Sequence, residues 1–107
     1  MAESNMGPPL PKVRTLALTC RAAPSQWEGQ LDDGRMFYVR VRRGELEVRL
    51  SIDPSTNVMD AVRATPSLEL DLSDPWASFM DEETMRAVTA SVLDFSEVGQ
   101  ATLGPDA

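Results

Sequence analysis

The sequence predicts an α+β fold in which an antiparallel β-meander of about four to five strands packs against one C-terminal α-helix. Two observations lead to this prediction. Residues 27–52 contain three runs of strand-forming residues separated by two turns with glycine. Residues 81–95 carry apolar side chains at helical spacing. A chain of 107 residues, 42% of them hydrophobic, can bury one core as a single domain.

We expect three segments along the chain. Residues 1–11 hold three prolines and one glycine without an apolar pattern, which predicts a disordered N-terminal lead-in. Residues 12–96 are expected to form the α+β domain. Residues 97–107 are expected to form a flexible C-terminal tail.

The first strand is expected over residues 12–21. The run VRTLALTC alternates there and puts Leu16, Leu18 and Cys20 on one side, and a turn is expected to follow at residues 23–25. This alternation predicts that Cys20 is a small core residue rather than a nucleophile.

The turn at Arg43-Gly44 fixes the register of the strands on either side of it. With a two-residue loop, the core-side pairs are all apolar: Val41 with Leu46, Val39 with Val48, and Phe37 with Leu50. The pairs on the other side are Arg42 with Glu45, Arg40 with Glu47, and Tyr38 with Arg49. Opposite charges that face each other across two strands stabilise the pair by roughly 0.2–1 kcal/mol. Because Arg43 would need a positive φ, a loop longer by one residue stays open.

The turn before it is predicted to be a three-residue loop, Asp32-Asp33-Gly34. This loop sets Trp27 opposite Val39 and Leu31 beside Phe37, and it puts the glycine at the left-handed position of a bulged turn. A two-residue loop would bring polar side chains to the core side.

Residues 53–67 read as a loop with up to two helical turns around residues 58–62. The next run, SLELDL, predicts a strand with Leu68, Leu70 and Leu72 inward and with acids outward. A second possible helix start lies at Asp74-Pro75, where Trp76, Phe79 and Met80 follow as apolar bulk.

The clearest helix is predicted over residues 81–95. Asp81 suits the N-cap, Glu82 and Glu83 suit the first turn, and Arg86 lies four residues after Glu82. The residues of its predicted buried stripe are Met85, Val88, Val92 and Phe95.

The residue types exclude most catalytic chemistry. The chain has no histidine, one cysteine and one lysine, which removes histidine-based triads and zinc sites. No glycine-rich phosphate loop occurs, and a calcium-loop frame over residues 71–82 fails because Pro75 and Trp76 stand where a ligand and a glycine are needed. A hydrolase with two carboxylates, for instance Glu28 and Glu47, stays formally open. We nevertheless expect no enzymatic activity, no metal and no cofactor.

No signal peptide and no run of 18 apolar residues is found in the sequence. We therefore expect a cytoplasmic protein with no membrane contact, as a monomer or a small homo-oligomer.

The run PSQWEGQLDDGRMFYVRVRRGELEV, residues 24–48, resembles a pattern found in small proteins of actinobacteria and their phages. The shared features are PSQWEG, a DGR turn, a tyrosine with alternating arginines, and a G-x-L-x-V strand. Aromatic residues often stand in that pattern where this chain has Val41 and Arg43. The resemblance implies a source in actinobacteria or phages. It implies no activity and no functional residues.

Charge is unevenly divided along the chain, whose net charge is −7. Residues 12–49 hold eight cations and five acids, whereas residues 50–107 hold two cations and eleven acids. The acidic half leads to our first hypothesis, a small acidic non-catalytic protein-binding module. Such a module would be a phage or mobile-element accessory protein that inhibits a host protein or occupies its surface. The candidate partner surface is Glu69, Asp71, Asp74, Asp81, Glu82 and Glu83. The same acids also fit a solvated face that keeps the protein in solution.

Two alternatives stay open. The sheet face with Tyr38, Arg40, Arg42 and Arg49 fits a nucleic-acid-binding surface, in which the tyrosine stacks and the arginines contact phosphates. We favour an internal charge ladder for these arginines, so nucleic acid is the less favoured partner. The second alternative is a self-assembling structural or chaperone-like accessory protein, which would associate through an open sheet edge or through the patch of Trp76, Phe79 and Met80.

Overall fold

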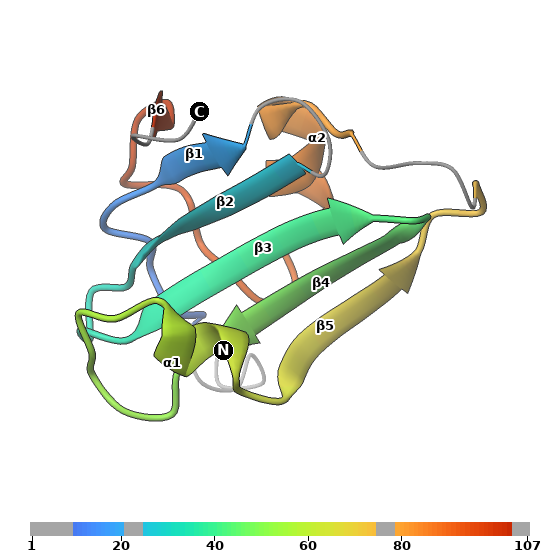
Figure 1. Ribbon diagram of the computed structural model, residues 1–107. Coiled ribbons are helices and arrows are strands. Elements are labelled where there is room, and N and C mark those ends of the chain that lie inside the picture. Colours follow the sequence, from blue (N-terminus) through green and yellow to red (C-terminus); the bar gives the residue numbers. More distant parts are fainter. Residues whose placement is uncertain (1–9, 21–24, 75–78, 104–107) are drawn as a thin grey trace, which may run out of the picture.

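The computed structural model describes residues 10–20, 25–74 and 79–103, which form one six-stranded sheet and two short helices (Figure 1). The strands are β1 (Ala17–Cys20), β2 (Ser25–Gln30), β3 (Met36–Arg42), β4 (Glu45–Leu50), β5 (Pro66–Asp71) and β6 (Thr102–Leu103). The helices are α1 (Met59–Val62) and α2 (Glu82–Val88). The α+β class is confirmed.

The order of strands across the sheet is β5-β4-β3-β2-β1-β6. The first five strands form an antiparallel meander, as predicted, but β6 runs parallel to β1. The predicted antiparallel meander is therefore present, but the sheet as a whole is mixed, because the sequence did not predict β6. The cause lies after α2, where the chain returns and the Thr102 amide donates to the Leu16 carbonyl at 3.0 Å.

The hairpin of β3 and β4 has the register that the sequence predicts. All six predicted pairs are present, from Phe37 opposite Leu50 to Arg42 opposite Glu45. The open question about the turn is also answered, because Arg43 and Gly44 form a two-residue loop with φ of 52° and 79°.

The three-residue loop between β2 and β3 is confirmed as well. Trp27 lies opposite Val39, and Gly34 has a φ of 92°. Leu31 is fully buried, and its amide donates to the Arg35 carbonyl at 2.8 Å. The residue directly opposite Phe37 is Gly29.

One face of the sheet forms the hydrophobic core. Its fully or nearly fully buried residues are Val13, Leu16, Trp27, Leu31, Phe37, Val39, Val41, Leu46, Val48, Met85 and Leu93. The chain from α2 to β6 passes behind the sheet in Figure 1 and supplies Met85 and Leu93 to this core. Val98 and Ala101 also pack against it, although they belong to the predicted tail.

The first strand is shorter than predicted, because β1 starts only at Ala17. Before it, Lys12 and Val13 form isolated bridges to Asp94 and Leu31. Leu16 is buried and Leu18 is half-buried, as expected. The Cys20 side chain and residues 23 and 24 of the predicted turn lie outside the described residues, whereas Ser25 begins β2.

The helix predicted over residues 81–95 ends at Val88. Its N-cap is confirmed, since the Asp81 carboxylate accepts from the Thr84 amide at 3.2 Å. The Thr89 hydroxyl donates to the Met85 carbonyl at 2.8 Å, a bond that competes with continued helix. Beyond this point the Asp94 amide donates to the Pro11 carbonyl, which draws the chain away from the helix axis.

The two remaining elements, α1 and β5, agree with the predictions made from the sequence. α1 is the short helical piece expected near residues 58–62, and its Ala61 is fully buried. In β5, Leu68 and Leu70 are half-buried while Glu69 and Asp71 are exposed, so the predicted alternation is confirmed. The possible helix start at Asp74-Pro75 extends into residues 75–78, which lie outside the described residues.

We predict that Gly29→Ala destabilises the protein. A Cβ at Gly29 would clash with the Thr15 carbonyl oxygen and would lie 2.8 Å from Cε1 of Phe37. Because main-chain atoms would have to move, the free energy of unfolding should fall by about 1–3 kcal/mol in a urea titration. Gly99→Ala is the matched control, since nothing lies within 4 Å of its added Cβ. An equal effect of both substitutions would contradict this explanation.

Candidate functional site

The sheet face opposite the core carries polar and charged side chains in cross-strand rows. One row runs from Arg40 on β3 to Glu47 on β4 and Glu69 on β5. The next runs from Arg42 to Glu45 and Asp71 on the same three strands. We call the four acids of these rows, Glu45, Glu47, Glu69 and Asp71, the acidic edge, because β5 is the outermost strand on this side.

The predicted binding face of Tyr38, Arg40, Arg42 and Arg49 lies on this same side of the sheet. Tyr38 is only 8% exposed, because it stands between Glu28 and Arg49 on an inner strand and α1 lies against β3 and β4. Burial raises the pKa of its phenol, and the nearby Arg40 only partly opposes this effect. A tyrosine in this position cannot stack on a base.

Two of the three arginines are held by the protein itself. Arg40 donates to Glu47 at 3.1 Å. Arg49 donates to the other oxygen of Glu47 and to the Ala64 carbonyl after α1. Arg42 is exposed, and within the described ranges no ion pair joins it to Glu45 although the two residues face each other. The predicted charge ladder therefore forms at one of its two rungs.

Glu47 is the electrostatic centre of this face. Burial disfavours its charged form, but hydrogen bonds from Arg49 and Arg40 outweigh burial and hold the pKa of this carboxyl below its ordinary value. Its side chain is 18% exposed, so the two arginines are less screened by solvent than a surface pair would be.

The other acids of the acidic edge lack such partners. In the part of the chain that the structure describes, no ion pair joins Glu45, Glu69 or Asp71 to a cation. Glu45 instead faces Asp71, and Glu47 faces Glu69, which places like charges directly opposite each other. Such pairs cost free energy in the isolated protein.

The six predicted surface acids do not lie together. Glu69 and Asp71 lie on β5, at one side of the sheet, and Asp74 follows in the next loop. Asp81, Glu82 and Glu83 lie at the start of α2 (Figure 1). Glu82 accepts from the Ala101 amide, next to β6 on the opposite edge of the sheet from β5.

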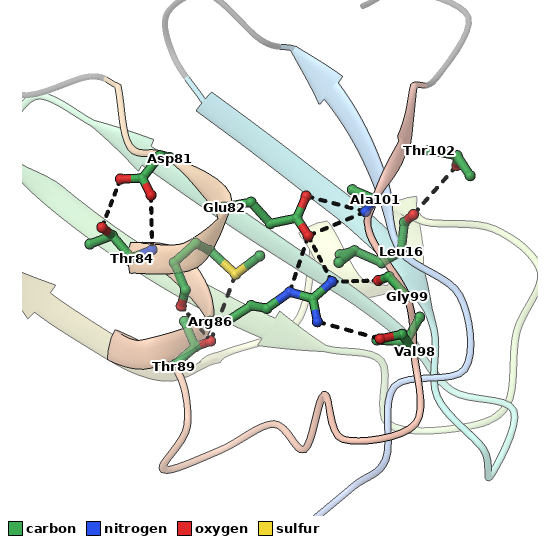
Figure 2. A network of polar contacts seen from close by, with 11 residues as sticks. Leu16, Asp81, Glu82, Thr84, Arg86, Thr89, Val98, Gly99, Ala101 and Thr102 are labelled. Atoms are coloured by element: carbon green, nitrogen blue, oxygen red, sulfur yellow. Dashed lines mark hydrogen bonds and ion pairs between the residues drawn. The ribbon is translucent and has the colours of Figure 1, made fainter.

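Glu82 is the acid of a polar network that ties the C-terminal segment to α2 (Figure 2). It accepts from Arg86 at 2.7 Å and from the Ala101 amide at 3.2 Å. Arg86 also donates to the Val98 and Gly99 carbonyls. The guanidinium lies 5.3 Å from the centroid of the Phe95 ring. Glu82 is thus a structural residue rather than part of an open surface.

The predicted apolar patch is described only in part. Phe79 is 62% exposed and, together with Met80, Leu18 and Trp27, lines a hollow of about 270 Å³. Trp76 lies outside the described residues, so self-assembly through this patch stays a prediction.

The sequence reasoning missed Glu45 and Glu47 as members of the same acidic group as Glu69 and Asp71. The signal was present, because ELEV at residues 45–48 and LELD at residues 68–71 share one alternation of acid and apolar residue. Two such strands that pair in register bring their acids together.

No family model, curated protein or solved structure matches the chain. The resemblance to small proteins of actinobacteria and phages stays an expectation. Within residues 10–20, 25–74 and 79–103, neither helix has the length and apolar content to cross a bilayer. Over the same residues, no group of three or more potential ligands is placed to hold a metal ion.

We predict that Glu47→Gln destabilises the protein in a pH-dependent way. The free energy of unfolding should fall by about 1–2 kcal/mol at neutral pH, because two arginines lose a charged acceptor. Since folding lowers the pKa of Glu47, this contribution is full above the ordinary value of 4.5 and is lost as the pH falls through the lower folded value. Unfolding curves of both proteins should therefore converge once the pH is below the lowered pKa of Glu47 in the folded protein. Glu45→Gln, the control, should change stability by less than about 0.5 kcal/mol.

We also predict that Arg86→Met loosens the C-terminal segment. The substitution keeps the apolar stem but removes the donor to Glu82, Val98 and Gly99. Stability should fall by about 1–3 kcal/mol, and hydrogen exchange at the Thr102 amide should accelerate. Arg63→Met is the control, because Arg63 is exposed and its side chain has no partner in the described ranges. Unchanged exchange at Thr102 in Arg86→Met would rule out this role.

Proposed function

We propose that this protein is a small, non-catalytic protein-binding module whose acidic edge meets a basic surface of a partner protein. The observation that carries the proposal is a set of three acids that form no ion pair with any cation among the described residues: Glu45 on β4, and Glu69 and Asp71 on β5, the outermost described strand. The absence of histidine and the single lysine support a non-catalytic role.

Like charges that face each other favour the binding of cations at the acidic edge. Glu45 and Asp71 repel in the isolated protein, whereas Arg40 and Arg49 offset the charge of Glu47 opposite Glu69. A basic partner relieves this repulsion and is also steered to the edge before contact. If the chain comes from a phage or another mobile element, as its resemblance suggests, such binding would cover a basic groove of a host protein and inhibit it.

Neither alternative function gains support of this kind. A nucleic-acid face would need a tyrosine that can stack, whereas Tyr38 is buried. Self-association along β5 would bring Glu69 and Asp71 of one copy against the same acids of another.

The double substitution Glu69→Gln with Asp71→Asn tests the proposal. Partners are captured from an actinobacterial lysate, identified by mass spectrometry, purified and titrated against the wild-type and variant proteins. We expect the variant to bind the captured partner about tenfold more weakly, and we expect wild-type binding to weaken similarly between about 0.05 and about 0.5 M NaCl.

The matched control is Asp53→Asn with Glu83→Gln, which removes two charges from exposed positions away from the acidic edge. Equal affinity of all three proteins, or binding that does not change with salt, would refute a basic partner at this edge.

A further inference from the structure

We infer that the partner contributes an extended segment that pairs with β5 as an additional antiparallel strand, and that Lys or Arg alternates with apolar residues in this segment. The inference rests on the proposed function and names the chemistry of the partner. The main-chain groups, the charges and the apolar side chains of β5, the outermost described strand, support this inference.

The main-chain groups of β5 divide into two sets. The Leu72 amide donates to the Gly44 carbonyl of the β3–β4 turn at 2.8 Å. In an antiparallel ladder the direction alternates with each residue, so Leu70 and Leu68 also bond toward β4. The amides and carbonyls of Glu69 and Asp71 therefore face away from the sheet. They form a hydrogen-bonding edge on the outermost strand.

The same two residues carry the acids of the outer strand. Two rows of the polar face have one cation and two acids, in the order Arg40, Glu47, Glu69 and Arg42, Glu45, Asp71. Strands lie about 4.8 Å apart, so an added strand has an acid as its nearest charged neighbour, and the arginines of β3 lie roughly three strand spacings away. A cation opposite Glu69 or Asp71 gives that acid the ion-pair partner that it lacks among the described residues.

The core side of β5 determines which residues fit between the cations of the added strand. Leu68, Leu70 and Leu72 pack against the core but remain half-buried, because none of the described strands lies beyond β5. An added strand with apolar residues between its cations places them beside these leucines and removes more of their surface from water.

The protein already contains one pair of strands with this chemistry. On β3 the run Arg40-Val41-Arg42 lies against Glu45-Leu46-Glu47 of β4, with cation opposite acid and apolar residue opposite apolar residue. The free edge of β5 offers the same alternation in Glu69-Leu70-Asp71. A partner segment patterned like β3 therefore fits it.

A second copy of this chain is a poor source of such a segment. Its β3 lies between β2 and β4 and is not available. Its β5 would bring acids against acids. The occupant is thus a segment of another protein.

Synthetic peptides test the inference directly. The parent peptide is Arg-Val-Arg-Val-Arg-Val, as long as β5 and blocked at both ends. In the inferred pairing the arginines lie opposite Glu69 and Asp71, so the arginine amides face β5 and the valine amides face solvent. One derivative is N-methylated at its arginines and a second at its valines, which leaves every charge in place. A scrambled peptide groups the three arginines at one end.

Binding is followed by NMR on the full chain, because a short peptide should bind with a Kd of only about 0.1–1 mM. We expect the valine-methylated peptide to bind within about threefold of the parent. The arginine-methylated and scrambled peptides should bind at least about tenfold more weakly. Hydrogen exchange at the Glu69 and Asp71 amides should slow on binding, whereas the Leu68 and Leu70 amides, already bonded to β4, should change little.

Other results separate the two proposals. Equal binding of all four peptides would overturn strand addition while a basic partner at the acidic edge still stood. If no peptide bound but the captured partner still depended on Glu69 and Asp71, strand addition would again be wrong and the proposed function would stand. If neither the peptides nor a captured partner depended on the acidic edge, both proposals would fail.

Discussion

The apolar pairing across β3, β4 and β5 is the constraint on which the rest of this structure depends. Val39, Val48 and Leu68 form one row on the core face, and Val41, Leu46 and Leu70 form the next. Because successive side chains alternate between the two faces, this register also decides which charged residues meet on the other side. A slip by one residue would bury acids and arginines in the core. The repulsion between the acids of β4 and β5 is therefore retained, since it is weaker than the burial that opposes a slip.

The sequence predicted the parts of the fold that depend on local alternation. The register of β3 and β4 followed from six apolar residues and two short turns, and the N-cap at Asp81 followed from its residue type. The parallel strand β6 could not be predicted in this way. It has two residues, and its position depends on hydrogen bonds from Arg86 to Gly99 and from Ala101 to Glu82, which join this segment to α2, earlier in the chain. The early end of α2 at Val88 has a similar cause, since Thr89 and Asp94 find partners outside the helix.

The candidate site was predicted less well than the fold. Charge counting placed the acids in one half of the chain, but the topology divides them between β5 and α2. Glu82 was predicted to be a surface acid, but it is a half-buried member of a polar network. Tyr38 was expected on an open face, and α1, a helix of only four residues, lies against its strand. Packing between segments that are distant in the sequence leaves no periodic pattern from which it could be predicted.

The two edge strands of the sheet, β5 and β6, differ in length, and this difference limits where another strand can be added. β6 covers the outer side of β1 over Ala17 and Leu18 and is itself only two residues long. Among the described strands, only β5 is both at an edge of the sheet and long enough to pair with an added strand. In the proposed complex each copy of this protein therefore offers one strand edge to one partner segment, while the outer side of β1 is already paired with β6.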